Sequence, residues 1–246
     1  MAYALWQYAL SPFIRAYAIR PYIEMNYFVT GTDTGVGKTL IACALLHGFA
    51  AQDKRAVGMK PVAAGCHAGE QNDDVFQLRA ASNVGVSYGL INPYCFLPAI
   101  APHIAAQRAG VIIDFSVIAK SYQELAAQAD VVIVEGVGGF RVPLNAQQDG
   151  ADLVLELGLP LILVVGMRLG CLNHALLTVE AIAARSLTLA GWVANVVEAD
   201  MALVEENVAA LQQRIAAPLL GVVPYMTQAD ARVAAKQLDL ELLEQD

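Results

Sequence analysis

The residues from Gly31 to Thr39 carry the clearest chemical signal in this chain. They read Gly-Thr-Asp-Thr-Gly-Val-Gly-Lys-Thr, after an apolar run at 27–29 and before a helix-forming stretch at 40–46. Strand, glycine-rich turn, Lys-Thr and helix in this order cradle phosphates, because glycines let several backbone N–H groups point at the phosphate oxygens. Lys38 would reach the β- and γ-phosphates of a nucleotide, and Thr39 would place its hydroxyl on Mg²⁺.

This loop departs from the usual phosphate-loop pattern in its length. The usual pattern has four residues between its two glycines, whereas five lie between Gly31 and Gly37, with Thr32 where the first glycine would stand. A Gly-Lys-Thr turn can also arise by chance. The strand and helix signals on either side favour the phosphate loop over that alternative.

The segments around the loop alternate between strand and helix patterns. We expect strands at 55–60, 131–134, 161–165, 189–197 and 219–223, and helices at 115–129, 172–185 and 201–215. The helix at 115 would be capped by Asp114 or Ser116. Six or seven alternations predict an α/β fold of the P-loop NTPase-like, doubly wound type, with a mostly parallel sheet and helices on both faces. We expect a single domain over 25–246.

Composition and charge limit the classes of function. The chain has 246 residues, a mean hydropathy of +0.49 and no apolar run of the roughly 18 residues that a membrane span needs. Its net charge is −8 and its pI about 4.9, so binding to nucleic acid or to an acidic membrane is not expected. The four cysteines, Cys43, Cys66, Cys95 and Cys171, form no Cys-x-x-Cys pair. We therefore expect reduced thiols in a cytoplasmic protein and no structural zinc site.

Residues 1–24 differ from the rest of the chain. They hold six of its 18 aromatic residues, and their arginines come too late and their prolines too centrally for a secretory signal. We expect a dispensable N-terminal extension. The alternative is a peripheral anchor, which no other feature supports.

Polar residues stand at the ends of the predicted strands, where parallel sheets bind ligands. Lys60 ends one strand, and Glu135 ends another before a glycine-rich turn. A carboxylate directly after four β-branched residues is costly to bury unless it is paired or binds a metal, and Mg²⁺ is the natural partner of Glu135. Lys60 is as compatible with a solvated lysine as with a functional one. Asp73 and Asp74 are compatible with helix capping or with a metal ligand.

Several blocks of sequence, in order, resemble dethiobiotin synthetases. The family's phosphate loop has the same extra residue, and the resemblance extends over about residues 26 to 226. The matching blocks are residues 29–39, 60–63, 92–94, 102–103, 134–139, 169–175 and 191–195. Such enzymes convert 7,8-diaminononanoate, CO₂ and Mg·ATP to dethiobiotin, ADP and phosphate through a phosphorylated carbamate, in biotin biosynthesis.

The resemblance implies a role for each matching position. Lys38 and Lys60 would be catalytic and stabilise the transferring phosphoryl group and the carbamate. Thr39, Asp74 and Glu135 would hold Mg²⁺, although Asp73 remains an alternative to Asp74. ATP would be bound by Gly35, Val36, Gly37, Lys38, Thr39, Leu40, Asp74, Glu135, Gly136, Val137, Gly138, Asn195, Val196, Pro224, Tyr225 and Met226. The diamine would contact Thr34, Ala64, Gly138, Cys171, Leu172 and Asn173, near a homodimer interface.

Two positions depart from the family pattern. Gly35 stands where well-known members carry a glutamate, and Ala64 where they carry a serine that contacts substrate. One lost hydroxyl hydrogen bond is worth on the order of 1 kcal/mol, which is a modest effect.

Two other readings share the fold. A switch ATPase of the chromosome-partition or septum-site type would carry a second lysine five residues before Lys38, where this chain has Asp33. An amide ligase acting on a corrin precursor would normally bring a glutamine-hydrolysing domain, for which no residues remain. Both are less consistent with the sequence than dethiobiotin synthesis.

Overall fold

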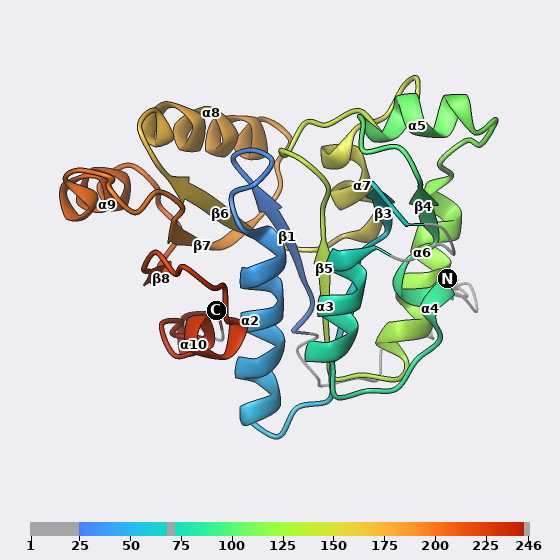
Figure 1. The fold of residues 1–246 in the computed structure, drawn as a ribbon, viewed down its shortest axis with the longest axis horizontal. Coiled ribbons are helices and arrows are strands. Elements are labelled where there is room, and N and C mark those ends of the chain that lie inside the picture. The colour runs from blue at the N-terminus through green and yellow to red at the C-terminus, as the bar shows by residue number, and fades with distance from the viewer. Residues whose placement is uncertain (1–24, 68–71, 244–246) are drawn as a thin grey trace, which may run out of the picture.

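The computed structural model describes residues 25–67 and 72–243, so the expectation for residues 1–24 lies outside the described part. A six-stranded, all-parallel sheet runs through the molecule in the order β2-β5-β1-β6-β7-β8 (Figure 1). Its strands are β2 (Ala56–Met59), β5 (Val131–Glu135), β1 (Tyr27–Gly31), β6 (Leu161–Met167), β7 (Leu189–Val196) and β8 (Leu219–Val223). The expected doubly wound fold is confirmed.

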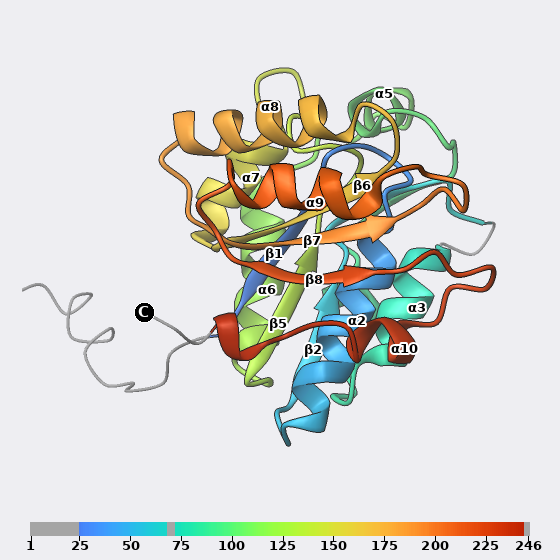
Figure 2. The ribbon, with the colours of Figure 1, turned by 90° about the vertical axis from the view of Figure 1, so that its left-hand side faces the viewer.

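Helices cover both faces of this sheet, and Figure 2 shows α8 and α9 on the opposite side of β7 and β8 from α2 and α10. One face carries α2 (Lys38–Ala51), α3 (Asp73–Ala81) and α10 (Ala231–Ala235), and the other α6 (Phe115–Ala126), α7 (Gly150–Leu157), α8 (Cys171–Ala184) and α9 (Val204–Gln212). The remaining elements are α4 (Tyr88–Ile91), α5 (Pro102–Arg108) and a 3₁₀ turn, η1 (Glu241–Leu243).

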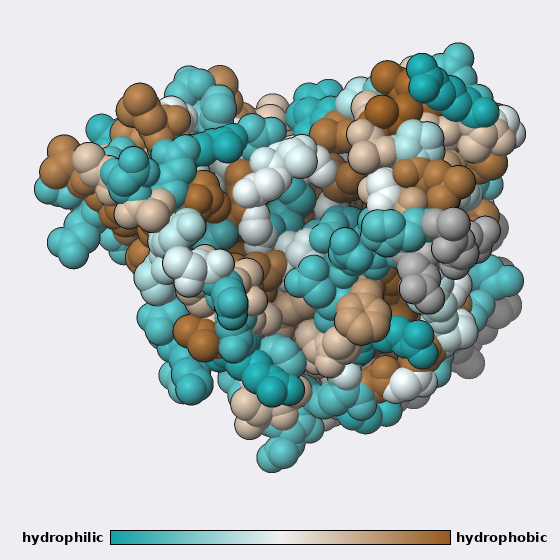
Figure 3. Space-filling model, viewed as in Figure 1, coloured by the Kyte–Doolittle hydropathy of each residue, from teal (hydrophilic) through white to brown (hydrophobic). Residues whose placement is uncertain are grey.

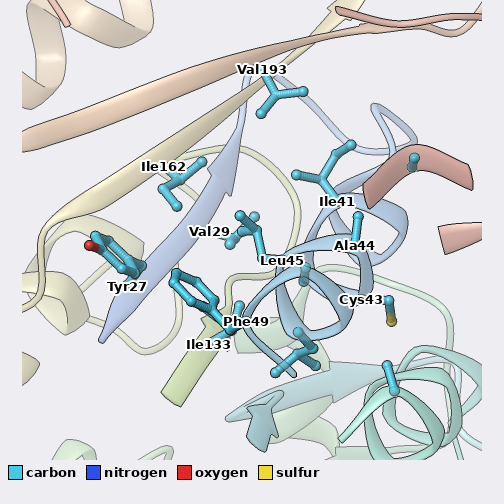
Figure 4. Packing of buried hydrophobic residues seen from close by; sticks show 14 of the residues in the cluster. Tyr27, Val29, Ile41, Cys43, Ala44, Leu45, Phe49, Ile133, Ile162 and Val193 are labelled. Carbon is cyan, nitrogen blue, oxygen red and sulfur yellow. The ribbon is translucent and has the colours of Figure 1, made fainter. Parts of the chain in front are cut away.

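Strand β1 shows how the core is divided between the two faces. Tyr27 and Val29 pack in the cluster around α2, whereas Phe28 points to the opposite cluster. Figure 4 shows the first cluster, where the Tyr27 ring stacks on Phe49 with 6.2 Å between ring centroids. Because β1 is buried on both faces, its carboxyl end is held rigidly at the point where the phosphate loop begins.

Side-chain caps define the first residues of several helices. Asp114 accepts a hydrogen bond from the Ser116 N–H, so Asp114 rather than Ser116 is the cap of α6. Asn72 accepts from the N–H groups of Asp74 and Val75 and begins α3. Asp149 and Asp152 form a reciprocal capping box at the start of α7.

The main strands follow the sequence expectation closely, and α9 differs most. The expected helix at 201–215 is shorter in the structure, because Leu203 adopts a left-handed conformation before α9 begins. A second sheet, in which β3 (Val62–Ala64) pairs in parallel with β4 (Tyr94–Phe96), was not expected from the sequence. Strands of three residues are too short for a periodicity signal.

The expectation of four reduced thiols was wrong. Cys66 and Cys95 form a disulfide, while Cys43 and Cys171 are buried free thiols. The β3–β4 pairing brings the bonded cysteines together across 29 residues of sequence, which spacing alone does not reveal.

The surface is mixed in polarity. Figure 3 shows hydrophilic and hydrophobic residues interspersed over the face that carries α2 and α3. No helix within residues 25–67 and 72–243 is long and apolar enough to cross a membrane.

Candidate phosphoryl-transfer site

The phosphate loop connects β1 to α2 and is shaped by two glycines in the left-handed conformation. Gly35 has a φ of 74° and Gly37 a φ of 89°, which other residues adopt only with strain. A Cβ on Gly37 would collide with the Asn195 amide, which donates a 2.8 Å hydrogen bond to the Val36 carbonyl. The start of α2 has no side-chain cap, so the N–H groups of its first turn are available to phosphate oxygens.

Lys38 lies at the base of this loop. Its side chain is buried, and its ammonium donates to the Asp33 carbonyl at 2.8 Å. Burial, together with the nearby Lys60, lowers the pKa of Lys38 to about 8. Burial destabilises the charged form of this lysine. A bound anion would stabilise that charged form and so offset the cost of burial.

Lys60, Asp74 and Glu135 meet beside the loop, as the sequence analysis expected. The Lys60 ammonium lies 2.6 Å from Glu135 Oε1, 3.1 Å from Asp74 Oδ2 and 3.1 Å from the Gly136 carbonyl. Thr39 Oγ1 donates to the same Glu135 oxygen at 2.8 Å. The site thus draws on the ends of β2 and β5 and on the starts of α2 and α3.

The structure distinguishes the two aspartates at the start of α3. The Asp73 side chain is 85% exposed and faces His67, whereas Asp74 turns inward to Lys60. Asp74 is therefore the carboxylate that belongs to the site.

The charges of this cluster depend on one another. Burial would lower the pKa of Lys60, but the carboxylates of Glu135 and Asp74 outweigh burial and raise it. Burial opposes ionisation of Asp74, yet Lys60 lowers the pKa of that carboxyl. Burial raises the pKa of Glu135 despite Lys60. Glu135 is therefore the member that gains most from a further cation.

The donor set fits Mg²⁺. Glu135 Oε2 is buried without a hydrogen-bond partner, on the carboxylate whose other oxygen receives Thr39 and Lys60. Among the described residues, no group of three or more His, Cys, Asp and Glu side chains could hold a metal alone. Two carboxylates and a hydroxyl suit an ion that takes oxygen ligands and completes its shell with phosphates and water.

The glycine-rich turn after β5 lies against the phosphate loop. A Cβ on Gly138 would come within 3.6 Å of Thr34 Oγ1, and Gly139 packs against the Gly31 carbonyl. Gly136 and Val137 line a small cavity of about 10 Å³ beneath the turn. Thr34 and Gly138, two expected substrate contacts, are therefore neighbours.

Ala64 is the last residue of β3 and half-buried. Its carbonyl accepts a 3.4 Å hydrogen bond from Asn72 Nδ2, next to the start of α3. This bond links the segment after Lys60 to the helix that carries Asp74.

Five of the residues expected to bind ATP lie at the end of β7 and directly after β8. Asn195 and Val196 end β7, with Asn195 against the phosphate loop. After β8, Tyr225 and Met226 line an open hollow of about 690 Å³. Pro224 precedes them and is exposed.

Three of the residues expected to contact the diamine, Cys171, Leu172 and Asn173, begin α8. Gly170 precedes it with a φ of 92° and provides no side-chain cap. Cys171 is buried, Leu172 half-buried and Asn173 exposed. The Cys171 N–H donates to the Arg168 carbonyl. The remaining N–H groups of a first helical turn lack intrahelical acceptors and lie at the positive end of the helix dipole.

Two residues with positioning roles were missing from the sequence expectation. Asn92 donates to the Lys60 carbonyl at 2.6 Å and holds the backbone of that lysine. Arg168 contacts Asp33 Oδ2 at 2.7 Å, from the loop after β6. Arg168 could have been found by the rule that polar residues at strand ends face the ligand site.

Comparisons with known proteins agree with this geometry. The family model described as "AAA domain" matches residues 25–233. The chain is 59% identical over 215 residues to the ATP-dependent dethiobiotin synthetase BioD of Nitrosospira multiformis, covering 87% of this chain and 95% of that protein. It is 60% identical over 213 residues to the protein of the same name from Aromatoleum aromaticum, covering 85% and 95%.

Among solved structures, the fold is similar to that of two cell division proteins. The MinC:MinD cell division protein complex of Aquifex aeolicus matches with a TM-score of 0.52 and 13% identity over 85% of each chain. MinD from the same organism matches with a TM-score of 0.50 and 14% identity over 87% of each chain. At such identities the likeness concerns the fold alone.

Proposed function

This chain belongs to the family of ATP-dependent dethiobiotin synthetases, and we propose from its site that it closes the ureido ring of dethiobiotin through a phosphorylated carbamate. The observation that carries the proposal is the convergence of two lysines and two carboxylates at the mouth of the phosphate loop. A carbamate and a triphosphate are both anions, so a site that joins them needs cations held in place before the substrates arrive.

The reaction has three steps. One amine of 7,8-diaminononanoate adds to CO₂ and loses a proton, giving a carbamate. A carbamate oxygen then attacks the γ-phosphorus of ATP, which yields a carbamic–phosphoric anhydride and ADP. The second amine attacks the anhydride carbonyl, closes the ring and releases phosphate and a proton.

Each lysine has a distinct part in these steps. Lys38, at the loop, would contact the β- and γ-phosphates and stabilise the negative charge that develops on them during phosphoryl transfer. Lys60, which is paired with Glu135, would contact the carbamate and the phosphoryl group that the carbamate receives. The buried setting of both lysines makes their electrostatic effect on the transition state larger than it would be in water.

Thr39, Asp74 and Glu135 are the residues that would hold Mg²⁺. When bound there, the ion neutralises charge on the phosphate oxygens and keeps Glu135 ionised. The unpaired Glu135 Oε2 supports this assignment.

The diamine would extend from Thr34, Ala64 and Gly138 toward the start of α8, where N–H groups receive its distant carboxylate. We further propose a homodimer with α8 at the interface. Its support is the apolar exposure there, since Leu169 is 98% exposed and Leu177 is also exposed. A monomeric mass in solution would contradict the dimer.

An assay of phosphate release tests the proposal. We expect the purified protein to release phosphate from Mg·ATP only when both the diamine and bicarbonate are present, with dethiobiotin as the product by mass spectrometry. ATP hydrolysis that ignores the diamine but responds to DNA or lipid would refute it and favour a switch ATPase.

A further inference from the structure

The loop after β6 is joined to the phosphate loop by an ion pair between Arg168 and Asp33. The guanidinium Nη2 lies 2.7 Å from Asp33 Oδ2, across 135 residues of sequence. Two other contacts join strand β6 itself to the phosphate loop, one residue earlier: the Thr32 N–H donates to the Val164 carbonyl, and Thr32 Oγ1 accepts from the Gly166 N–H. Beyond Asp33, Thr34 and Gly35 are exposed. Arg168 therefore holds the last anchored residue before the exposed part of the loop.

Asp33 links Arg168 to the catalytic lysine of the loop. Its Oδ1 accepts a 2.7 Å hydrogen bond from the Thr34 N–H, and its backbone carbonyl accepts the Lys38 ammonium at 2.8 Å. Asp33 therefore contacts Arg168 with its side chain and Lys38 with its main chain. A single residue, Asp33, thus connects Arg168 to Lys38.

Charge gives Arg168 a second effect. Asp33 places a carboxylate in a loop that cradles phosphates, where a negative charge opposes the binding of another anion. Arg168 neutralises that carboxylate where the two touch. Without the arginine, an incoming triphosphate would meet an uncompensated negative charge.

Arg168 also lies next to the other end of the proposed active site. Its carbonyl accepts the Cys171 N–H at 3.0 Å, so the turn that begins α8 is built on Arg168 itself. The same residue therefore contacts the phosphate loop with its side chain and the start of the diamine-binding helix with its backbone.

We propose that Arg168 is a positioning residue for nucleotide binding, which holds and neutralises Asp33 so that the loop and Lys38 are preset for Mg·ATP. This inference rests on the proposed function in assuming that the loop binds ATP. If the ion pair only stabilised the fold, removal of either partner would have the same effect on the affinity for Mg·ATP. If Arg168 neutralises Asp33, only removal of the arginine weakens that affinity.

The experiment compares the affinity of four variants for Mg·ATP, measured calorimetrically without diamine. We expect Arg168→Met to weaken binding about tenfold, and Arg168→Lys by no more than about threefold, since lysine keeps the charge but not the fork. Asp33→Asn keeps the acceptor for the Thr34 N–H and should stay within about threefold of the unaltered protein. Asp33→Asn combined with Arg168→Met should recover most of the loss, because no unpaired carboxylate remains.

The matched control is Arg55→Met, which breaks another 2.7 Å Arg–Asp pair, with Asp130. This pair lies directly before the amino ends of β2 and β5, away from the carboxyl ends that carry the site. The control variant should leave the affinity for Mg·ATP unchanged. Unchanged affinity in Arg168→Met, or a double variant weaker than either single one, would overturn the proposal. If Arg168→Met does not fold, a loss in Asp33→Asn greater than that in Arg168→Lys overturns it. Because binding is measured without diamine, a failure to form dethiobiotin leaves this test intact.

Discussion

The two sides of the proposed active site are built in different ways. The nucleotide side is one continuous segment, from β1 through the loop into α2, and its lysine is held within that segment by the Asp33 carbonyl. The acceptor side is assembled from distant segments. Lys60 is held by Glu135 at a separation of 75 residues and by Asn92 at a separation of 32.

The difference shows where each side gets its rigidity. The nucleotide side is fixed by a strand buried on both faces and a helix packed beneath it. The acceptor side combines the ends of β2 and β5 with the short strands β3 and β4, and it is stabilised by an ion-pair cluster and by the Cys66–Cys95 disulfide. Changes on the acceptor side should therefore affect stability and turnover together, whereas changes in the loop should act mainly on nucleotide binding.

The largest effect is expected from Lys60→Gln. Turnover should fall about 10²–10³-fold, because a cation that faces the transferring group is lost. The affinity for Mg·ATP should change far less. Steady-state dethiobiotin formation and calorimetric binding measure the two quantities. Glutamine is chosen because its amide can still donate to Glu135, whereas alanine would remove the cation from that buried carboxylate and leave nothing in its place, which is strongly destabilising. Equal losses in turnover and ATP affinity would erase the distinction between the two sides.

Loss of the disulfide should come next. It closes a loop with a sequence separation of 29, and in the chain-entropy model its reduction lowers the free energy of unfolding by about 3–4 kcal/mol. Urea unfolding with and without dithiothreitol measures this change. The matched control is Cys66→Ala combined with Cys95→Ala, which should not respond to the reductant. Four titratable thiols in the unreduced, unfolded chain would contradict the disulfide.

The pH dependence of nucleotide binding should separate the two lysines. The pKa of Lys38 is lowered to about 8, so its ammonium is lost as pH rises through 8, whereas the raised pKa of Lys60 keeps that residue charged. The affinity for Mg·ATP should fall by up to about tenfold between pH 7 and pH 9. Lys38→Arg, whose guanidinium stays charged, should bind with little pH dependence. A slope in Lys38→Arg equal to that of the unaltered protein would assign the titration to another group.

The smallest effect is expected from deletion of residues 1–24. The family model begins at residue 25, and we propose that the domain does not need the preceding segment. The free energy of unfolding should change by less than about 1 kcal/mol. Thermal unfolding of the shortened protein tests this, and loss of soluble protein on deletion would refute it.

The sequence predicted the main sheet better than the region beside the site. The strands that begin at 131, 161 and 219 are rich in β-branched residues and leucine, and these signals are local. The strands β3 and β4 have three residues each and are stabilised by pairing with one another. No local sequence pattern therefore predicted them. The pairing of Cys66 with Cys95 was missed for the same reason.

The sequence by itself determined the phosphate loop, its family and the strand ends that bear Lys60 and Glu135. These features depend on residue type and local order, which a sequence contains directly. Only the tertiary structure decided that Asp74 rather than Asp73 faces Lys60, that Glu135 keeps an unpaired buried oxygen, and that Arg168 pairs with Asp33. Each of these depends on a distance between side chains remote in sequence, and packing of the whole sheet sets that distance.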